Sequence, residues 1–132
     1  MTKMWKCCAW LMLLFATACA TGERPGTVLR RDFPSVEIQR LGGHDFLYAD
    51  SSDRAVLDAL HRTMQAGVPK DKIEKVILRS RVRGGRAGSH ELWLRIAGCD
   101  KLVYMGANFN GRVVAVQDRG DCLKLAAGPS LQ

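Results

Sequence analysis

The stretch that decides the fold is GCDKLVYMGANFNGRVVAVQDRGDC, which runs from Gly98 to Cys122. Its middle is Asn110-Gly111, the strongest short signal for a two-residue hairpin, because a type I′ turn needs positive φ at both central positions. With that turn, facing positions on the two strands have numbers that sum to 221, as 110 and 111 do, so Cys99 faces Cys122. The stretch therefore predicts an antiparallel hairpin with two cysteines placed to meet.

The same register predicts which side of the hairpin is buried, because side chains on a strand alternate between its two faces. The expected core face consists of Cys99, Val103, Met105, Ala107, Phe109, Val114, Val116 and Cys122. The wetter face carries Asp100, Asn108, Gln117, Arg119 and Asp121. The two cysteines form a hydrogen-bonded pair with Cα atoms about 5.5 Å apart, within the span of a disulfide. The alternative is two free buried thiols, but burial alone does not place cysteines in register.

Upstream segments complete an α+β pattern. SHELWLRIAG alternates apolar Leu92, Leu94 and Ile96 with other residues and predicts a third strand, so the C-terminal half is a meander. SSDRAVLDALHRTMQAG predicts a helix with Ser51 and Ser52 as N-cap candidates and ends at Gly67.

Two further segments are more ambiguous. VPKDKIEKVI predicts a second helix that starts at Pro69, whereas KVILRSRV also fits an edge strand with Val76, Leu78 and Val82 inward. SVEIQRL and DFLYAD flank Gly42-Gly43 and predict a small hairpin. We therefore expect two short helices packed on a three- to four-stranded antiparallel sheet that ends in the disulfide-linked hairpin.

The N-terminus has the build of a secretory signal. Lys3 and Lys6 precede twelve residues of low polarity from Cys7 to Ala18, too few to span a bilayer as a helix. Ala16-Thr17-Ala18-Cys19 resembles a bacterial lipobox, in which the cysteine is acylated and becomes the new N-terminus. An ordinary cut after Ala20 is the alternative. A buried N-terminal helix is the structural alternative to a signal.

The expected domain boundaries follow from this signal. Residues 1–18 form the signal peptide, 19–32 a flexible lipid-anchored tether, 33–125 a single α+β domain, and 126–132 a disordered tail. Of the five cysteines, Cys7 and Cys8 leave with the signal and Cys19 is lipidated or removed. The even remainder, Cys99 and Cys122, is typical of one disulfide in an exported protein.

About 60 residues carry a resemblance to a known family. LHRTMQAGVPKDKIEKVI, LWLRI, LVYMGANF and NGRVVAV look like the SmpA/OmlA (BamE-like) domain of bacterial envelope lipoproteins, in which two helices precede strands. The matching positions are Gly67, Val68, Ile73, Val76, Phe109, Asn110, Gly111 and Val113. The chain lacks the Gly-x-Pro that usually closes the second helix, and it adds an N-terminal hairpin. The resemblance implies the α+β fold and an envelope location, without a specific partner.

Charge provides the main candidate contact. Loss of Lys3 and Lys6 with the signal reduces 20 basic residues to 18, against 13 acidic ones, an excess of +5. Four arginines cluster in RSRVRGGRAG, which is expected to be a glycine-rich loop: Arg79, Arg81, Arg83 and Arg86. In an exported protein such a basic contact patch fits an anionic lipid or an acidic envelope protein rather than nucleic acid. A solvated loop whose charge serves solubility is the alternative.

No catalytic or metal-binding motif is recognisable. His44, His61 and His90 lack metal-ligand spacing, and no P-loop, G-x-S-x-G or paired C-x-x-C occurs. Ser89-His90-Glu91 has the residue types of an acyl-transfer site, but neighbours on a strand point to opposite faces. We therefore expect neither an enzyme, a cofactor nor a small-molecule substrate.

The resulting hypothesis is a non-enzymatic bacterial cell-envelope lipoprotein. It acts as a structural or interaction module on the periplasmic side, anchored at the outer membrane by a lipid on Cys19. The alternative is a soluble periplasmic or secreted binding or inhibitor protein that begins at Thr21. Four aromatic residues fall on predicted strands, where they usually pack in the core or on the sheet, and several exposed together would mark a docking face: Phe46, Tyr48, Trp93 and Tyr104.

Overall fold

The computed structural model describes residues 22–42, 49–83 and 86–127, apart from the side chains at 49, 82, 83, 86 and 87. The elements, in chain order, are α2 (Pro25–Asp32), β1 (Glu37–Leu41), α3 (Ala49–Gln65), the 3₁₀ turn η2 (Lys70–Lys72), β2 (Ile73–Arg83), β3 (Arg86–Ile96), β4 (Val103–Ala107), β5 (Val113–Gln117) and α4 (Cys122–Ala126). The five strands form one sheet in the order β1-β2-β3-β4-β5. The α+β class is confirmed, but the sheet is mixed because β1 runs parallel to β2.

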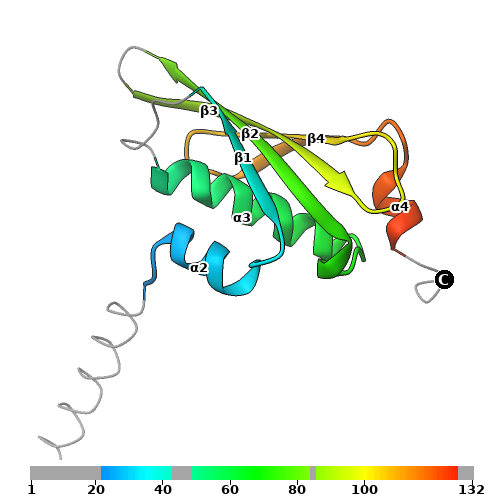
Figure 1. The fold of residues 1–132 in the computed structure, drawn as a ribbon. Coiled ribbons are helices and arrows are strands. Elements are labelled where there is room, and N and C mark those ends of the chain that lie inside the picture. The colour runs from blue at the N-terminus through cyan, green and yellow to red at the C-terminus, as the bar shows by residue number, and fades with distance from the viewer. Residues whose placement is uncertain (1–21, 43–48, 84–85, 128–132) are drawn as a thin grey trace, which may run out of the picture.

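One face of this sheet is covered by helices. Figure 1 shows α3 lying across the sheet, with α2 on the side of α3 that faces away from the strands. The core between α3 and the sheet is aliphatic, and these members are all 0 % exposed: Ala55, Val56, Ala59, Leu60, Val76, Leu92, Leu94 and Val103. Burial of each valine or leucine side chain stabilises the fold by roughly 1.5 to 3 kcal/mol, which makes this layer the main source of stability.

Helix α3 is where the sequence predicts a helix, although it begins earlier. It starts at Ala49, so Ser51 and Ser52 lie inside its first turn rather than at the N-cap. Gly67 follows the helix with φ +101°, a conformation that glycine adopts without a steric penalty.

The predicted second helix is wrong. Pro69 precedes only the single turn η2, and the chain enters β2 at Ile73. The alternative prediction of a strand is correct, and Val76 and Leu78 point inward as expected, since both are buried. β2 is nevertheless a central strand and not an edge strand, because it pairs with both β1 and β3. The β-branched run around Val76 suits a strand paired on both sides, and this tertiary pairing overrides the helical spacing.

The predicted N-terminal hairpin is also wrong for β1. Its partner is β2, in parallel, with Gln39 opposite Ile77 and Leu41 opposite Arg79. Parallel neighbours need a crossover connection, and α3 is the helix of that connection. Most of DFLYAD lies outside the described residues, and its last two positions, Ala49 and Asp50, begin α3.

The central hairpin keeps its predicted register along part of its length. Tyr104 pairs with Gln117, Met105 with Val116, and Gly106 with Ala115, so all three pairs sum to 221. Next to the turn the register shifts at a β-bulge, and Ala107 pairs with Val113.

The residues that are buried along this hairpin differ from the prediction, next to the bulge and also at Val116, which keeps its predicted partner Met105. Val103, Met105 and Ala107 are in the core as expected, but three predicted core residues are exposed: Phe109 by 60 %, Val114 by 67 % and Val116 by 45 %. The turn is longer than two residues. Asn108 Oδ1 accepts hydrogen bonds from the backbone N–H groups of Asn110 and Arg112, each at 3.0 Å. An Asx-type turn of this kind replaces the type I′ turn and introduces the extra residue.

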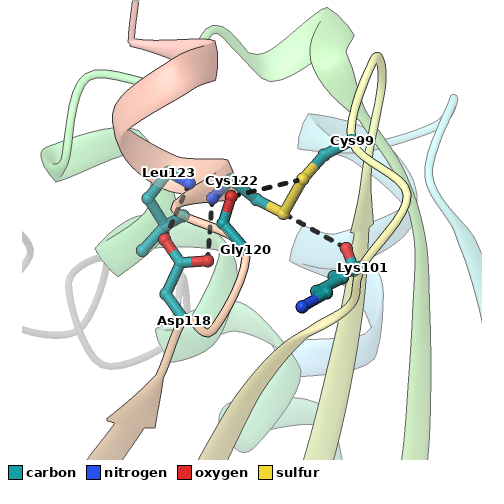
Figure 2. Close-up of a disulfide and its surroundings, with 6 residues drawn as sticks. All are labelled: Cys99, Lys101, Asp118, Gly120, Cys122 and Leu123. Carbon is teal, nitrogen blue, oxygen red and sulfur yellow. Dashed lines mark hydrogen bonds between the residues drawn. A yellow bond between two sulfur atoms is a disulfide. The ribbon is translucent and has the colours of Figure 1, made fainter.

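The predicted disulfide between Cys99 and Cys122 is present, with Cα atoms 5.7 Å apart (Figure 2). The route to it differs from the prediction, because the strands end at Val103 and Gln117. Cys122 instead begins helix α4. Asp118 fixes that start: its two carboxylate oxygens accept hydrogen bonds from the N–H groups of Cys122 at 2.8 Å and Leu123 at 2.9 Å. The capped helix therefore brings Cys122, which is 0 % exposed, onto Cys99.

Part of the predicted tether is folded. Residues 25–32 form α2, and Leu29 and Phe33 are only 2 % and 4 % exposed where this segment packs against α3. Gly26 permits the close approach, because a Cβ there would lie 2.7 Å from Asp53 Oδ2. At the C-terminus α4 runs to Ala126, which is 5 % exposed and so belongs to the core, while residues 128–132 lie outside the described residues.

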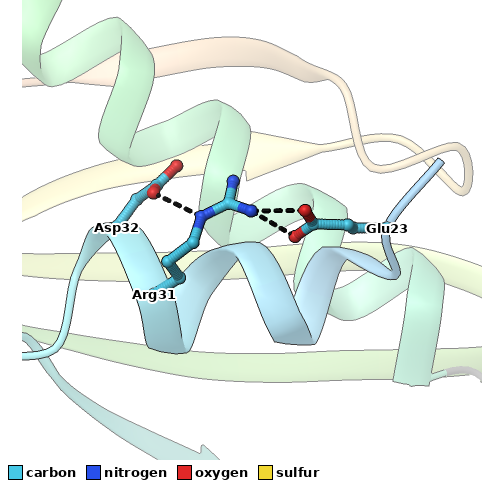
Figure 3. Close-up of polar contacts among 3 residues, drawn as sticks. All are labelled: Glu23, Arg31 and Asp32. Atoms are coloured by element: carbon cyan, nitrogen blue, oxygen red, sulfur yellow. Dashed lines mark hydrogen bonds and ion pairs between the residues drawn. The ribbon is translucent and has the colours of Figure 1, made fainter. Parts of the chain in front are cut away.

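The outer side of α2 carries an exposed ion cluster. Arg31 donates to Asp32 Oδ1 at 3.0 Å and also pairs with Glu23, which precedes the helix (Figure 3). The hydrogen bond from Arg31 is the main reason that the pKa of Asp32 lies below its ordinary value. Surface pairs of this kind contribute little to stability, so α2 is held mainly by Leu29 and Phe33.

Candidate binding surfaces

The arginine stretch is a hairpin, not a loop. Arg79, Arg81 and Arg83 belong to β2, Arg86 begins β3, and Arg83 and Arg86 are register partners at the end of the ladder. This end of the β2–β3 hairpin extends beyond the other strands, at the end of the sheet away from α4 (Figure 1). Arg79 and Arg81 are exposed, whereas the side chains of the other two are not described. The ladder between β2 and β3 continues through this stretch, with a register shift between Ser80 and Val82.

The face of the sheet opposite α3, here called the outer face, carries a row of residues that crosses all five strands. Its members are register neighbours: Gln39, Ile77, Trp93, Tyr104 and Gln117. Trp93 lies between Leu92 and Leu94, which point inward, so alternation directs this row outward. The Trp93 and Tyr104 rings are 5.7 Å apart between centroids and tilted by 59°, an arrangement that aromatic pairs favour. No helix among the described residues covers this row.

Basic residues flank the aromatic pair on both sides. Lys75 and Arg95 are register partners on one side, and Arg79 and Glu91 on the other. Arg81 donates to Glu91 at 3.1 Å, and Lys75 lies 3.9 Å from Glu37. Within the described part of the chain, Arg79 and Arg95 form no ion pair. The outer face thus combines aromatic rings with uncompensated positive charge.

A second surface feature is a cavity of about 510 Å³ between α3 and the β4–β5 turn. Arg54, Asp58 and His61 line it from α3, and Asn108 and Arg112 line it from the turn. Asp58 is already engaged, because its Oδ2 accepts a hydrogen bond from Val113 N–H at 2.7 Å and lies 3.5 Å from Arg62. Arg54 and Arg112, by contrast, make no ion pair with any residue that the structure describes.

The turn that lines this cavity, residues 108–112, is fixed against α3. Ser51 Oγ donates a hydrogen bond to the Phe109 carbonyl. Gly111 has φ +80°, and a Cβ there would lie 2.7 Å from the Ser51 carbonyl oxygen and 2.9 Å from Ala55 N. No side chain fits in that space, so the turn rests directly on the helix backbone.

Three polar residues that are far apart in the sequence form a cluster in the fold: Ser51, Ser80 and His90. His90 is 1 % exposed, and its Nε2 and Nδ1 each lie 2.8 Å from a hydroxyl, of Ser51 and Ser80 respectively. Because Ser51 donates its only proton to Phe109, His90 Nε2 is assigned as the donor to Ser51, and Nδ1 then accepts from Ser80. In this arrangement His90 does not accept the Ser51 proton, which is the opposite of a nucleophile–base pair.

Other predicted sites have simple outcomes. Cys19 and His44 lie outside the described residues, and His61 is exposed, with its ring 5.9 Å from that of Phe33. Over the described ranges, no group of three or more His, Cys, Asp or Glu residues is placed to hold a metal ion. Among the helices that the structure describes, none is long and apolar enough to cross a bilayer.

Comparison with known proteins found no matching family model, no matching curated protein and no matching solved structure. The second helix implied by the resemblance to the SmpA/OmlA (BamE-like) domain is occupied here by η2 and β2.

Proposed function

We propose that this chain is a non-enzymatic cell-envelope lipoprotein that acts as an interaction module at the membrane surface. The outer face of its sheet rests on anionic lipid headgroups, and a lipid on Cys19 provides the anchor. The outer membrane, on its periplasmic side, is the proposed location. The observation that carries this proposal is the composition of the outer face.

Tryptophan and tyrosine are the residues that concentrate at membrane–water interfaces, because their rings are apolar and their polar atoms remain hydrated. Trp93 and Tyr104 lie side by side at the centre of the outer face. Arginine next to such rings pairs with phosphate oxygens, and each basic residue near an anionic surface contributes about 1 kcal/mol of attraction. Arg79 and Arg95 are exposed and have no ion pair within the described residues, so both are available for this role.

The disulfide supports an exported location, because such bonds persist in oxidising compartments and are rare in the cytosol. The distance between anchor and domain is also short. Five residues lie between Cys19 and Pro25, the start of α2, and the six Cα-to-Cα steps from one to the other span roughly 20 Å when the chain is fully extended. A lipid on Cys19 would therefore hold the domain close to the bilayer.

The anchor is tested by intact mass of the mature protein from membrane and soluble fractions. A membrane-bound species that begins at Cys19 and is heavier by acyl chains supports the lipoprotein. The matched variant is Cys19→Ser, which should lose the added mass and leave the membrane fraction. An unmodified species that begins at Thr21 would instead favour the alternative, a diffusible periplasmic or secreted binding or inhibitor protein.

The lipid contact is tested separately, with a chain that begins at Thr21 and so carries no anchor. We expect it to sediment with vesicles of equimolar phosphatidylglycerol and phosphatidylcholine, and not with phosphatidylcholine alone. Arg79→Gln together with Arg95→Gln should weaken this binding roughly 30-fold, which corresponds to the loss of two contacts of about 1 kcal/mol each.

The matched control for that experiment is Arg119→Gln together with Lys124→Gln. These two residues are exposed near the disulfide, so the pair changes the net charge equally and leaves the outer face intact. Equal binding to both kinds of vesicle, or equal losses in the two double variants, would contradict a specific contact through the outer face. Crosslinking of the outer face to an acidic envelope protein would then show that the partner is a protein and not a lipid.

A further inference from the structure

We infer that the cavity between α3 and the β4–β5 turn is a binding site for a phosphate monoester. This site is distinct from the outer face, since its lining comes from α3 and from residues 108–112. The inference does not depend on the lipid anchor or on the outer-face contact. Its volume, about 510 Å³, falls within the usual range of roughly 300 to 1,000 Å³ for small-ligand sites.

The lining of the cavity carries two arginines. Arg54 and Arg112 line the cavity from its two walls, and neither is paired with an acid within the described residues. Asp58, the acidic residue of the lining, accepts a hydrogen bond from Val113 N–H and lies near Arg62. Its charge is therefore compensated by groups other than Arg54 and Arg112. The cavity is therefore lined by two arginines that form no ion pair within the described residues and by one carboxylate, Asp58, that is already engaged by Val113 and Arg62.

The cavity also has side-chain amides that can donate hydrogen bonds to a ligand. Asn108 uses its side-chain oxygen to accept hydrogen bonds from the N–H groups of Asn110 and Arg112, which fixes the orientation of its amide. The amide nitrogen of Asn108, Nδ2, points away from these N–H groups and makes no hydrogen bond with a described residue. Asn110 adds a second amide to the lining, and both sit on a turn that is held rigidly against α3.

The number of donors in the cavity favours a phosphate monoester over a carboxylate. One carboxylate is satisfied by a single bidentate guanidinium, which would leave the second arginine unpaired. A phosphate monoester has three terminal oxygens, enough to accept from two guanidinium groups and an amide at the same time. Leu57 adds an apolar wall to the cavity, suitable for the carbon skeleton of the ester. The rigid turn reduces the ordering cost of binding, as preorganisation does generally.

The inference is tested by isothermal titration of the purified mature protein with glycerol 3-phosphate and with inorganic phosphate, in a chloride buffer. We expect saturable one-site binding of glycerol 3-phosphate. Arg54→Gln and Arg112→Gln should each weaken it about tenfold or more, because each removes a charge-assisted contact. Arg119→Gln, an exposed arginine near the disulfide, is the matched control and should leave the affinity unchanged.

Three further results keep the inference falsifiable. Both cavity arginines are exposed, so the variants should retain the thermal midpoint of the parent, and lost binding with an unchanged midpoint supports the site. Retained binding in Arg79→Gln with Arg95→Gln separates the cavity from the outer face. Competition of glycerol 3-phosphate by vesicles that contain phosphatidic acid identifies a lipid headgroup as the source of the phosphate, whereas no competition identifies a soluble ester. No binding of either soluble probe, or equal loss in Arg119→Gln, would overturn the inference.

Discussion

The two faces of the sheet are built from the same strands and differ in almost every physical property. On β3, Leu92, Leu94 and Ile96 point toward α3 and are at most 1 % exposed, whereas Trp93 and Arg95 between them point outward and remain accessible. The inner face is aliphatic and enclosed, so it stabilises the fold. The outer face has aromatic rings and unpaired arginines that the fold does not need. The difference teaches that alternation along one strand separates the residues that stabilise the fold from those that remain available for contacts, and each set can be changed alone.

The largest expected effect tests this separation on one strand. Leu94→Ala should reduce the free energy of unfolding by about 2 to 5 kcal/mol, because it removes a fully buried side chain and leaves a cavity. The adjacent Arg95→Ala, on the outer face, should change it by no more than about 0.5 kcal/mol. Urea unfolding monitored by circular dichroism measures both. Similar losses for the two variants would break the distinction between the faces.

The covered side is closed at one end by the disulfide, which gives the next largest effect. Replacing Cys99 and Cys122 together by alanine should cost about 3 kcal/mol, since the bond closes a loop with a sequence separation of 23. The measurement is urea unfolding of the parent with and without reductant. The double variant should be insensitive to reductant, which is the control. A parent that unfolds at the same urea concentration under both conditions would refute a stabilising disulfide.

A smaller effect is expected from His90, which lies buried on the inner face. Ser80→Ala removes the hydroxyl 2.8 Å from His90 Nδ1 and should cost about 1 kcal/mol, typical of one lost hydrogen bond in the interior. Ser89→Ala, an exposed neighbour on the same hairpin, is the matched control. Thermal unfolding compares the two. An effect of Ser89→Ala as large as that of Ser80→Ala would show that the Ser80 contact to His90 contributes nothing specific.

The smallest effect lies away from the sheet, at the exposed carboxylate of Asp32. Its pKa is lowered below 3.8, chiefly by the hydrogen bond from Arg31. A lowered folded-state pKa stabilises the protein above the unfolded-state value, and that contribution disappears as the pH falls through the folded-state value. Asp32→Asn should therefore be slightly less stable than the parent near neutral pH, and the difference should disappear as the pH falls through the folded-state pKa of Asp32. Because the group is exposed, the difference should be close to the limit of detection.

The sequence predicts the parts of the fold that depend on neighbouring residues. Alternation finds the inward residues of β3, helical spacing finds α3, and Asn110-Gly111 finds the β4–β5 hairpin with three correct residue pairs. The register of the same hairpin predicts the disulfide, although Cys122 reaches Cys99 from helix α4 and not from a strand. Among the candidate contacts, Arg79 and Trp93 are recognisable for the same reason, because a composition pattern or a period of two is a local property.

The remaining features depend on contacts between distant segments. The pairing of β1 with β2 joins residues that lie on either side of α3, and no local pattern in β1 specifies a parallel partner. The bulge near Val114 shifts one residue and reverses the predicted burial around it. The cavity combines Arg54 with Arg112, and the His90 cluster combines three elements. A single sequence offers no signal for such meetings in space.

The order of strands in the sheet equals their order in the chain. Each strand from β2 onward can therefore join the free edge left by the strand before it, and no strand has to be inserted between two that have already paired. β1 is the exception, because its partner β2 lies beyond α3 in the chain. From β2 onward the pairings are between sequence neighbours, for which the entropy cost of loop closure is small and assembly is fast. Cys122 follows the last strand and Cys99 precedes β4, so the covalent bond ties together the two ends of the last hairpin of the sheet.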